Sequence, residues 1–282
     1  MPARRRASQT AARAGDRVDT AALAVAADAL AALDAADYTD WSYAPVGAAL
    51  EKARIVVAAD WPSAQLVADA TALLAEVRAG LVRTDADTAT AAPAKGVLSH
   101  DNGWDTGLLD GDYRITMNLW WGQNASSLRL YENGVFVTAV PLTYNGMTAQ
   151  KAVIPITGRG NGTYRYTAVL ANTVGETTLA PLTVTVTAAN PGTPVLSHDN
   201  HDRDGAYTVT ANMWWGTNAT SYRFYADGVL VSEGTLTART PAAQTANLAV
   251  TGATQGTHVY RVEFRNAAGA TSSAPLTVKV TR

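Results

Sequence analysis

The sequence predicts a multidomain chain in which a three-helix bundle is followed by two tandem β-sandwiches. Residues 19–83 are rich in alanine and carry apolar residues at helical spacing. From residue 97 onward threonine and valine become common, glycine and asparagine interrupt the pattern, and the helical periodicity disappears. This second part of the chain is also an internal repeat, so the same all-β fold is expected twice.

Three helices joined by short turns are expected in residues 19–83. The first begins behind Asp19, the second covers 42–59 with Ser42 as its N-cap and Pro45 in its first turn, and the third covers 63–80 with Gly80 as its C-cap. Their similar lengths favour an up-down-up bundle. The side chains expected to face its core are Leu23, Ala26, Ala27, Leu30, Leu33, Ala36, Leu50, Ala53, Ile55, Val57, Leu66, Val67, Ala70, Leu73, Leu74 and Val77.

Polar segments separate these domains. Residues 1–18 contain the basic run Arg4-Arg5-Arg6 and are expected to form a disordered tail. Residues 84–96 (TDADTATAAPAKG) hold small and polar residues and are expected to be a flexible linker. Residues 188–192 form a shorter connector between the two copies of the repeat.

The two copies of the repeat span 97–187 and 193–282. After a four-residue insertion in the first copy they align at an offset of 94, so that WWG at 120–122 matches WWG at 214–216. Each copy has about seven short alternating runs with turn residues between them. This pattern is typical of an immunoglobulin-like or fibronectin type III-like sandwich.

Each copy places two adjacent tryptophans at the end of a strand. Alternation assigns the first, Trp120 or Trp214, to the polar face that also carries Asn118 or Asn212. It assigns Trp121 and Trp215 to the core face, together with Tyr113, Ile115, Met117 and Leu119 in the first copy and Tyr207, Val209, Ala211 and Met213 in the second. A β-bulge near Gly122 or Gly216 would exchange the two.

An exposed indole beside asparagine and threonine is a common arrangement for holding a sugar ring. Covering about 60 Å² of apolar surface contributes roughly 1.5 kcal/mol, so one such contact gives weak binding. Two modules that bind the same polymer chain have a higher overall affinity, because binding of the first raises the effective concentration for the second. The alternative is that the neighbouring strand or the other module covers each tryptophan, which then has a packing role only.

Several function classes are disfavoured. The net charge is −2, which gives no large field to attract nucleic acid, and no apolar run is long enough for membrane insertion. The absence of cysteine excludes disulfides and cysteine-ligated zinc. The start of a calcium loop at Asn200–Gly205 has Ala211 where the bidentate glutamate belongs. Because no catalytic motif or carboxylate pair is found, we expect a chain that is not an enzyme and needs no cofactor or metal. We also expect a monomer.

Residues 19–83 resemble the FIVAR module, a three-helix unit of surface and secreted proteins of Gram-positive bacteria. The resemblance is carried by Tyr38-Thr39 ahead of Ser42-Tyr43, by Ala48-Ala49-Leu50 with Ala53, and by Gln65–Ala70 with Leu73 and Leu74. It implies a domain that binds cell-wall sugar or extends a stalk.

Residues 93–187 and 191–281 resemble the fibronectin type III-like modules of secreted bacterial chitinases and related enzymes. The matching residues are Asn118-Leu119-Trp120, Gly122 and Leu130–Gly134, repeated as Asn212-Met213-Trp214, Gly216 and Phe224–Gly228. The resemblance implies that Trp120 and Trp214 contact chitin. A second surface tryptophan of the family falls where this chain has His100 and His198, so these histidines are the corresponding candidates.

The resemblance therefore implies a non-catalytic accessory region that binds chitin or another cell-wall glycan. The parent protein would be a secreted or surface-associated glycoside hydrolase or polysaccharide lyase whose catalytic domain lies outside this chain. Residues 1–15 show no signal-peptide core, which is expected of a fragment. The alternative is an adhesion or spacer stalk without a sugar site, in which Trp120 and Trp214 are buried between modules.

Overall fold

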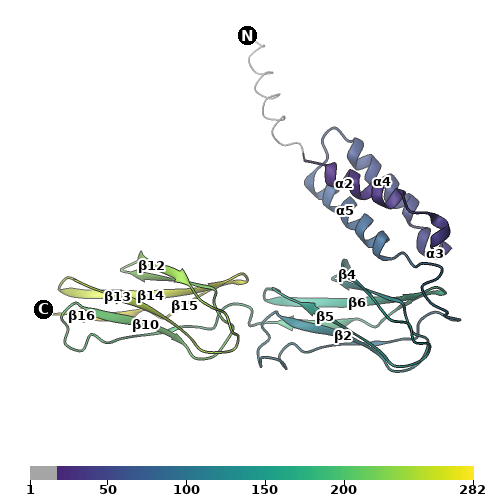
Figure 1. The fold of residues 1–282 in the computed structure, drawn as a ribbon. Coiled ribbons are helices and arrows are strands. Elements are labelled where there is room, and N and C mark those ends of the chain that lie inside the picture. Colours follow the sequence, from purple (N-terminus) through teal and green to yellow (C-terminus); the bar gives the residue numbers. More distant parts are fainter. Residues whose placement is uncertain (1–17) are drawn as a thin grey trace, which may run out of the picture. The chain divides into compact units, whose positions relative to one another are not determined.

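The computed structural model describes residues 18–282, and the predicted tail lies almost wholly outside them. The described chain forms a helical domain followed by two β-sandwiches (Figure 1). The predicted fold class is therefore confirmed.

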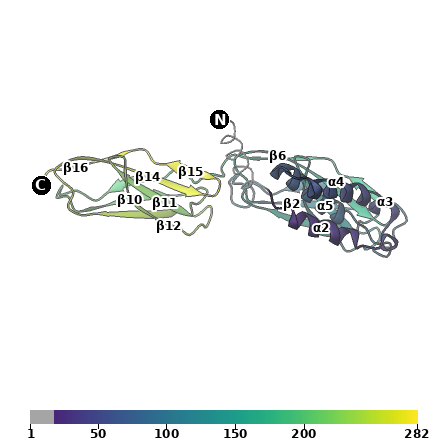
Figure 2. The same ribbon diagram turned by 90° about the horizontal axis from the view of Figure 1, so that it is seen from above.

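The helical domain is built from α2 (Ala21–Ala31), α4 (Val46–Ala58) and α5 (Ala64–Ala79), which pack side by side (Figures 1 and 2). The short 3-10 helix η1 (Ala35–Asp37) and the short helix α3 (Asp40–Tyr43) connect α2 to α4. Small and branched apolar side chains fill the space between the three longer helices. The buried residues of this core are Leu23, Ala27, Leu30, Val46, Ala49, Ala53, Val56, Ala70, Leu74 and Val77.

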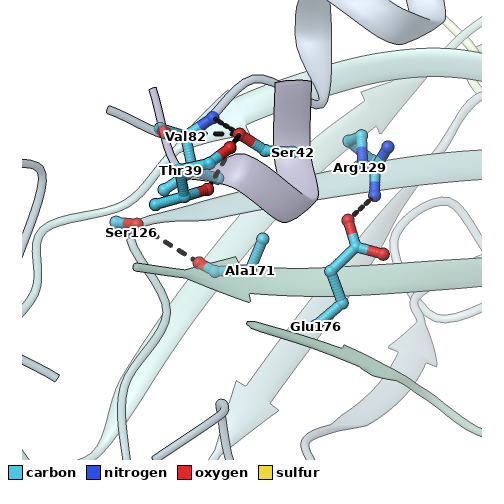
Figure 3. Close-up of polar contacts among 7 residues, drawn as sticks. All are labelled: Thr39, Ser42, Val82, Ser126, Arg129, Ala171 and Glu176. Carbon is cyan, nitrogen blue, oxygen red and sulfur yellow. Dashed lines mark hydrogen bonds and ion pairs between the residues drawn. The ribbon is translucent and has the colours of Figure 1, made fainter. Parts of the chain in front are cut away.

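The second predicted helix begins later than expected because Ser42 has a different role. Ser42 lies inside α3, and Pro45 is the residue that precedes α4. The buried Ser42 hydroxyl accepts hydrogen bonds from the Val82 backbone N–H (3.0 Å) and the Thr39 hydroxyl (2.9 Å), as Figure 3 shows. Ser42 therefore joins the segment before α4 to the segment after α5. Gly80 ends α5, as predicted.

Three side chains predicted to face the bundle core are exposed instead. Ala36 lies in η1, and Ile55 and Leu66 line an apolar groove of about 490 Å³ on the outer side of α4 and α5. The alanine-rich helices pack closely through Ala49, Ala53 and Ala70, so a few larger side chains suffice to fill the core. Helical spacing alone does not show which of several adjacent apolar faces the partner helix covers.

The first sandwich pairs a sheet of order β1-β2-β5 with a sheet of order β4-β3-β6-β7, in which β8 also pairs with β6. The Ser126 hydroxyl donates to the Ala171 carbonyl (3.3 Å), and Arg129 forms an ion pair with Glu176 across the second sheet (Figure 3). The strands are β1 (Val97–His100), β2 (Tyr113–Leu119), β3 (Ser127–Glu132), β4 (Val135–Pro141), β5 (Gln150–Ile156), β6 (Gly162–Asn172), β7 (Gly175–Thr178) and β8 (Leu182–Val186).

The second sandwich repeats this topology, with sheets β9-β10-β13 and β12-β11-β14-β15 and with β16 beside β14. Alternate residues of β10 and β13 enter the core, where they meet Phe224, Val262 and Phe264 from the other sheet. The strands are β9 (Val195–His198), β10 (Tyr207–Met213), β11 (Ser221–Ala226), β12 (Val229–Thr235), β13 (Gln244–Val250), β14 (Gly256–Asn266), β15 (Gly269–Ser272) and β16 (Leu276–Val280).

Repeat-equivalent asparagines attach the segment in front of each sandwich. The buried Asn172 side chain donates to the Ala91 carbonyl (2.8 Å), and Asn266 donates to the Ala189 carbonyl (2.9 Å). Asp87 also accepts a hydrogen bond from the backbone N–H of Thr173 (3.1 Å). Parts of the predicted linkers 84–96 and 188–192 thus pair with a sandwich, and the ends of these segments belong to the folded modules.

Candidate functional site

The paired tryptophans follow the ends of two equivalent strands. Strand β2 ends at Leu119 and β10 ends at Met213, directly before each pair. Trp120 and Trp214 are 71% and 65% exposed, in agreement with the alternation of the strands. Trp121 and Trp215 are 73% and 58% exposed, so the prediction that they enter the core is wrong. Each sandwich presents two neighbouring indoles to solvent.

The turn after each tryptophan pair explains why the second indole stays outside. Gly122 and Gly216 have φ values of +104° and +143°, which L side chains rarely adopt. A Cβ on Gly122 would lie 2.5 Å from the Cβ of Ala94. The turn brings the Gln123 carbonyl against the Ala94 N–H (2.8 Å), and the fully buried Ala125 takes the next place in the core. The alternation of β2 therefore extends only to Trp120, and Trp121 already belongs to the turn, which leaves its side chain outside the core.

A buried amide fixes the backbone behind each pair. Asn124 is fully buried, its side chain donates to the Thr148 carbonyl (2.7 Å), and its backbone N–H donates to the Gly146 carbonyl (2.8 Å). In the second sandwich the Asn218 side chain donates to the Ala242 carbonyl in the same way (2.8 Å). The indoles are thus mounted on a hydrogen-bonded turn, which lowers the entropy cost of presenting them to a ligand.

The predicted asparagine partners lie on the same sheet face as the first tryptophan of each pair. Asn118 and Asn212 are half-buried and precede Trp120 and Trp214 by two residues, the period of a strand. The Asn212 Oδ1 atom accepts a hydrogen bond from the Thr245 hydroxyl (2.9 Å), which orients its amide. These side chains are therefore near enough to the first indole to contact the same ligand.

The candidate histidines lie elsewhere. His100 and His198 are half-buried and pack edge-on against Tyr113 and Tyr207, with ring centroids 6.5 Å apart in both cases. His198 pairs with Val209, whose side chain faces the core and which precedes Trp214 by five residues, or about 17 Å along the strand. The structure therefore does not bring the histidines and the tryptophans onto one surface.

Sequence reasoning missed a further exposed indole. Trp104 is 88% exposed and lies in the loop between β1 and β2, where the first copy carries its four-residue insertion. Its backbone N–H donates to the Asp101 carbonyl (2.7 Å). The insertion was visible in the comparison of the two copies and could have drawn attention to this residue.

Several ionisable groups have shifted pKa values. Burial raises the pKa of Asp110, which follows Trp104 in the same loop, and burial raises the pKa of Tyr131 on β3 to about 12. Hydrogen bonds from the Val259 N–H and from His258 lower the pKa of Asp227 in the β11–β12 hairpin. Within residues 18–282 no group of three or more acidic or histidine side chains is arranged to hold a metal ion.

The comparison with protein families gives one match. Residues 195–282, which make up most of the second sandwich, match the sequence model of the family described as the chitinase A N-terminal domain. This segment includes Trp214 and Trp215. No curated protein matches the chain. In the described part of the chain, no helix is both long and apolar enough to cross a membrane.

The solved structures that match this chain come from diverse proteins. Red sea bream transglutaminase is 14% identical with a TM-score of 0.27, and the match covers 67% of this chain and 32% of that one, so this chain spans about a third of that protein's length. The fibronectin(III)-like modules of Clostridium thermocellum CbhA are 15% identical with a TM-score of 0.22, over 65% of this chain and 93% of theirs. The human OSCAR ligand-binding domain is 14% identical with a TM-score of 0.27, over 67% of this chain and all of that one.

Proposed function

We propose that the two sandwiches bind polysaccharide through their paired tryptophans and form a non-catalytic accessory region of a secreted carbohydrate-acting protein. The observation that carries this proposal is the exposure of Trp120, Trp121, Trp214 and Trp215 at equivalent positions of both copies. Tryptophan is usually well buried, because its large apolar surface is costly to hydrate. Four exposed indoles on fixed turns are therefore best explained by a ligand that covers them.

The magnitude of the expected contact fits a polymer ligand. One pyranose ring covers about 60 Å² of an indole, which corresponds to roughly 1.5 kcal/mol or about a tenfold gain in affinity. Each sandwich would bind a short sugar weakly. A long chain that reaches both sandwiches would be bound more tightly through effective concentration.

The family match of residues 195–282 supports a role beside a polysaccharide-degrading catalytic domain, with chitin as the first polymer to test. The FIVAR-like helical domain would then extend the region or contact cell-wall sugar. The spacer alternative requires Trp120 and Trp214 to be covered by another module, whereas their own sandwiches leave them 71% and 65% exposed, so the binding experiment below decides between the two.

The test is binding of the purified chain to insoluble chitin, cellulose, xylan and peptidoglycan, measured as the bound fraction after sedimentation. The Trp120→Ala/Trp214→Ala variant is expected to lose most binding to the polymer that the wild type prefers. Trp61→Ala is a matched control, because Trp61 is also exposed but lies in the turn between α4 and α5.

Binding that survives Trp120→Ala/Trp214→Ala would remove these residues from the site. A folded wild-type chain that binds none of the four polymers would instead support the spacer stalk.

A further inference from the structure

The outer face of the β9-β10-β13 sheet in the second sandwich is uncharged and rich in hydroxyl and amide groups. Thr210 pairs with Ser197 on one side and Asn247 on the other, and Asn212 pairs with Val195 and Thr245 in the same way. Directly opposed residues point to the same face of a sheet. Because Val209, Ala211 and Met213 face the core, these six side chains all lie on the solvent side.

This surface, called here the hydroxyl–amide face, consists of Ser197, Thr210, Asn212, Thr245 and Asn247, with the exposed Val195 at its edge on β9. It measures about 10 Å across its three strands and extends about 13 Å from Thr210 to Trp214. At its far end Asp199 accepts a hydrogen bond from the Thr208 N–H (2.6 Å), and this carboxylate marks the limit of the uncharged area.

We propose that the second sandwich binds a neutral polysaccharide chain along the hydroxyl–amide face, with Trp214 stacking on one sugar ring. This inference rests on the proposed function and specifies the class of its ligand. Serine and threonine hydroxyls and asparagine amides both donate and accept hydrogen bonds, as sugar hydroxyls do. A polymer with regular carboxylate or ammonium groups would require opposite charges, which the face does not offer.

The hydrogen bond between Thr245 and Asn212 supports this assignment. It joins neighbouring strands on the solvent side at 2.9 Å and fixes the orientation of the Asn212 amide two residues before Trp214. A polar group that is already oriented loses less freedom when a ligand hydroxyl binds to it. The face and the indole therefore form one continuous surface.

The first sandwich provides an internal comparison. It retains Ser99, Thr116 and Asn118, but the residues that correspond to Thr245 and Asn247 at the offset of 94 are Lys151 and Val153, both exposed. A cation and an isopropyl group thus replace a hydroxyl and an amide. The first sandwich is expected to contribute its indoles to binding but not an equivalent polar face.

The exchange of these two positions tests the proposal in the full chain. Thr245→Lys/Asn247→Val gives the second sandwich the residues of the first, and is expected to weaken binding to the preferred neutral polymer at least fivefold. Thr245→Ser/Asn247→Thr keeps the polar groups and is expected to bind within twofold of the wild type. Binding is measured as isotherms on the polymer, and circular dichroism and thermal melting establish that each variant is folded.

Two further measurements separate the outcomes. Trp214→Ala reports on the indole site alone. Cationic chitosan and anionic polygalacturonate are added as competitors, and neither is expected to displace the chain from the neutral polymer. Unchanged binding of Thr245→Lys/Asn247→Val alongside a loss in Trp214→Ala would overturn the role of the face and leave the proposed function intact. Preference of the wild type for a charged polymer would also overturn the inference. Absence of binding to every polymer would overturn both proposals.

Discussion

Substitution of Gly122 tests whether the turn behind the first tryptophan pair depends on the close approach to Ala94. Gly122→Ala is expected to destabilise the first sandwich for two reasons. An alanine at φ +104° costs about 1–2 kcal/mol in backbone strain. Its Cβ would also lie 2.5 Å from the Ala94 Cβ, so the segment must move and weaken the hydrogen bond from Ala94 to Gln123, at about 1 kcal/mol more.

The chain offers a matched control in Gly134. This glycine is also in the left-handed region, at φ +83°, but a Cβ there would meet no atom within 4 Å. Gly134→Ala should therefore cost only the backbone term of about 1–2 kcal/mol. Because 1 kcal/mol shifts the melting temperature of a domain of this size by about 4–8 °C, the expected decreases are about 15 °C for Gly122→Ala and about 9 °C for Gly134→Ala.

The assay is differential scanning calorimetry of the full chain, with the transition of the first sandwich followed in each variant. A melting temperature in Gly122→Ala that is no lower than in Gly134→Ala would refute the argument, because the contact with Ala94 would then contribute nothing. Gly216→Ala adds a graded case in the second sandwich, since its Cβ would lie 3.1 Å from the Gly192 Cα. The steric part of its effect should be smaller than that of Gly122→Ala.

Three further predictions follow from single contacts. Ser42→Ala should lower the stability of the helical domain by about 1–3 kcal/mol in urea unfolding, because a buried N–H loses its acceptor. Asn172→Asp should lower the melting temperature of the first sandwich, because a carboxylate cannot donate to the two carbonyls that the Asn172 amide reaches. Hydrogen bonds to Thr254 and Asp227 raise the pKa of His258, so its stabilising contribution is complete below pH 6.5 and is lost as the pH rises through the raised value. The pKa of Asp227 is lowered, so its contribution is present above pH 3.8 and is lost in acid. The stability difference between wild type and His258→Gln should therefore be largest between about pH 4 and 6.5 in urea titrations.

Periodicity in the sequence was sufficient to predict the domain classes and the repeated sandwich. Prediction from periodicity failed where tertiary contacts determine the backbone conformation. Alternation correctly assigned the residues of β2 up to Leu119, but the following turn depends on Gly122 and on a contact with Ala94 from a segment that precedes the sandwich. Ser42 was predicted as an N-cap for a similar reason, because its true partner, the Val82 N–H, lies 40 residues away in the sequence.

The comparison of the two copies also separates the residues that maintain the sandwich from those that face solvent. The buried amides recur at equivalent positions and make equivalent hydrogen bonds: the side chains of Gln150 and Gln244 each pair with the backbone of a buried alanine, and Asn172 and Asn266 each attach the preceding segment. A buried polar group without its partner is costly, so such positions tolerate little change.

On the solvent side of the same strands this restriction is absent. Lys151 and Val153 in one copy correspond to Thr245 and Asn247 in the other, although Gln150 and Gln244 directly precede them. The strand register that brings Thr245 beside Asn212 could not be read from either strand alone, because pairing joins residues 33 positions apart. Divergence on the surface beside retained buried amides is what we expect if one module has acquired a contact surface that the other lacks, and the exchange of these two positions tests that difference directly.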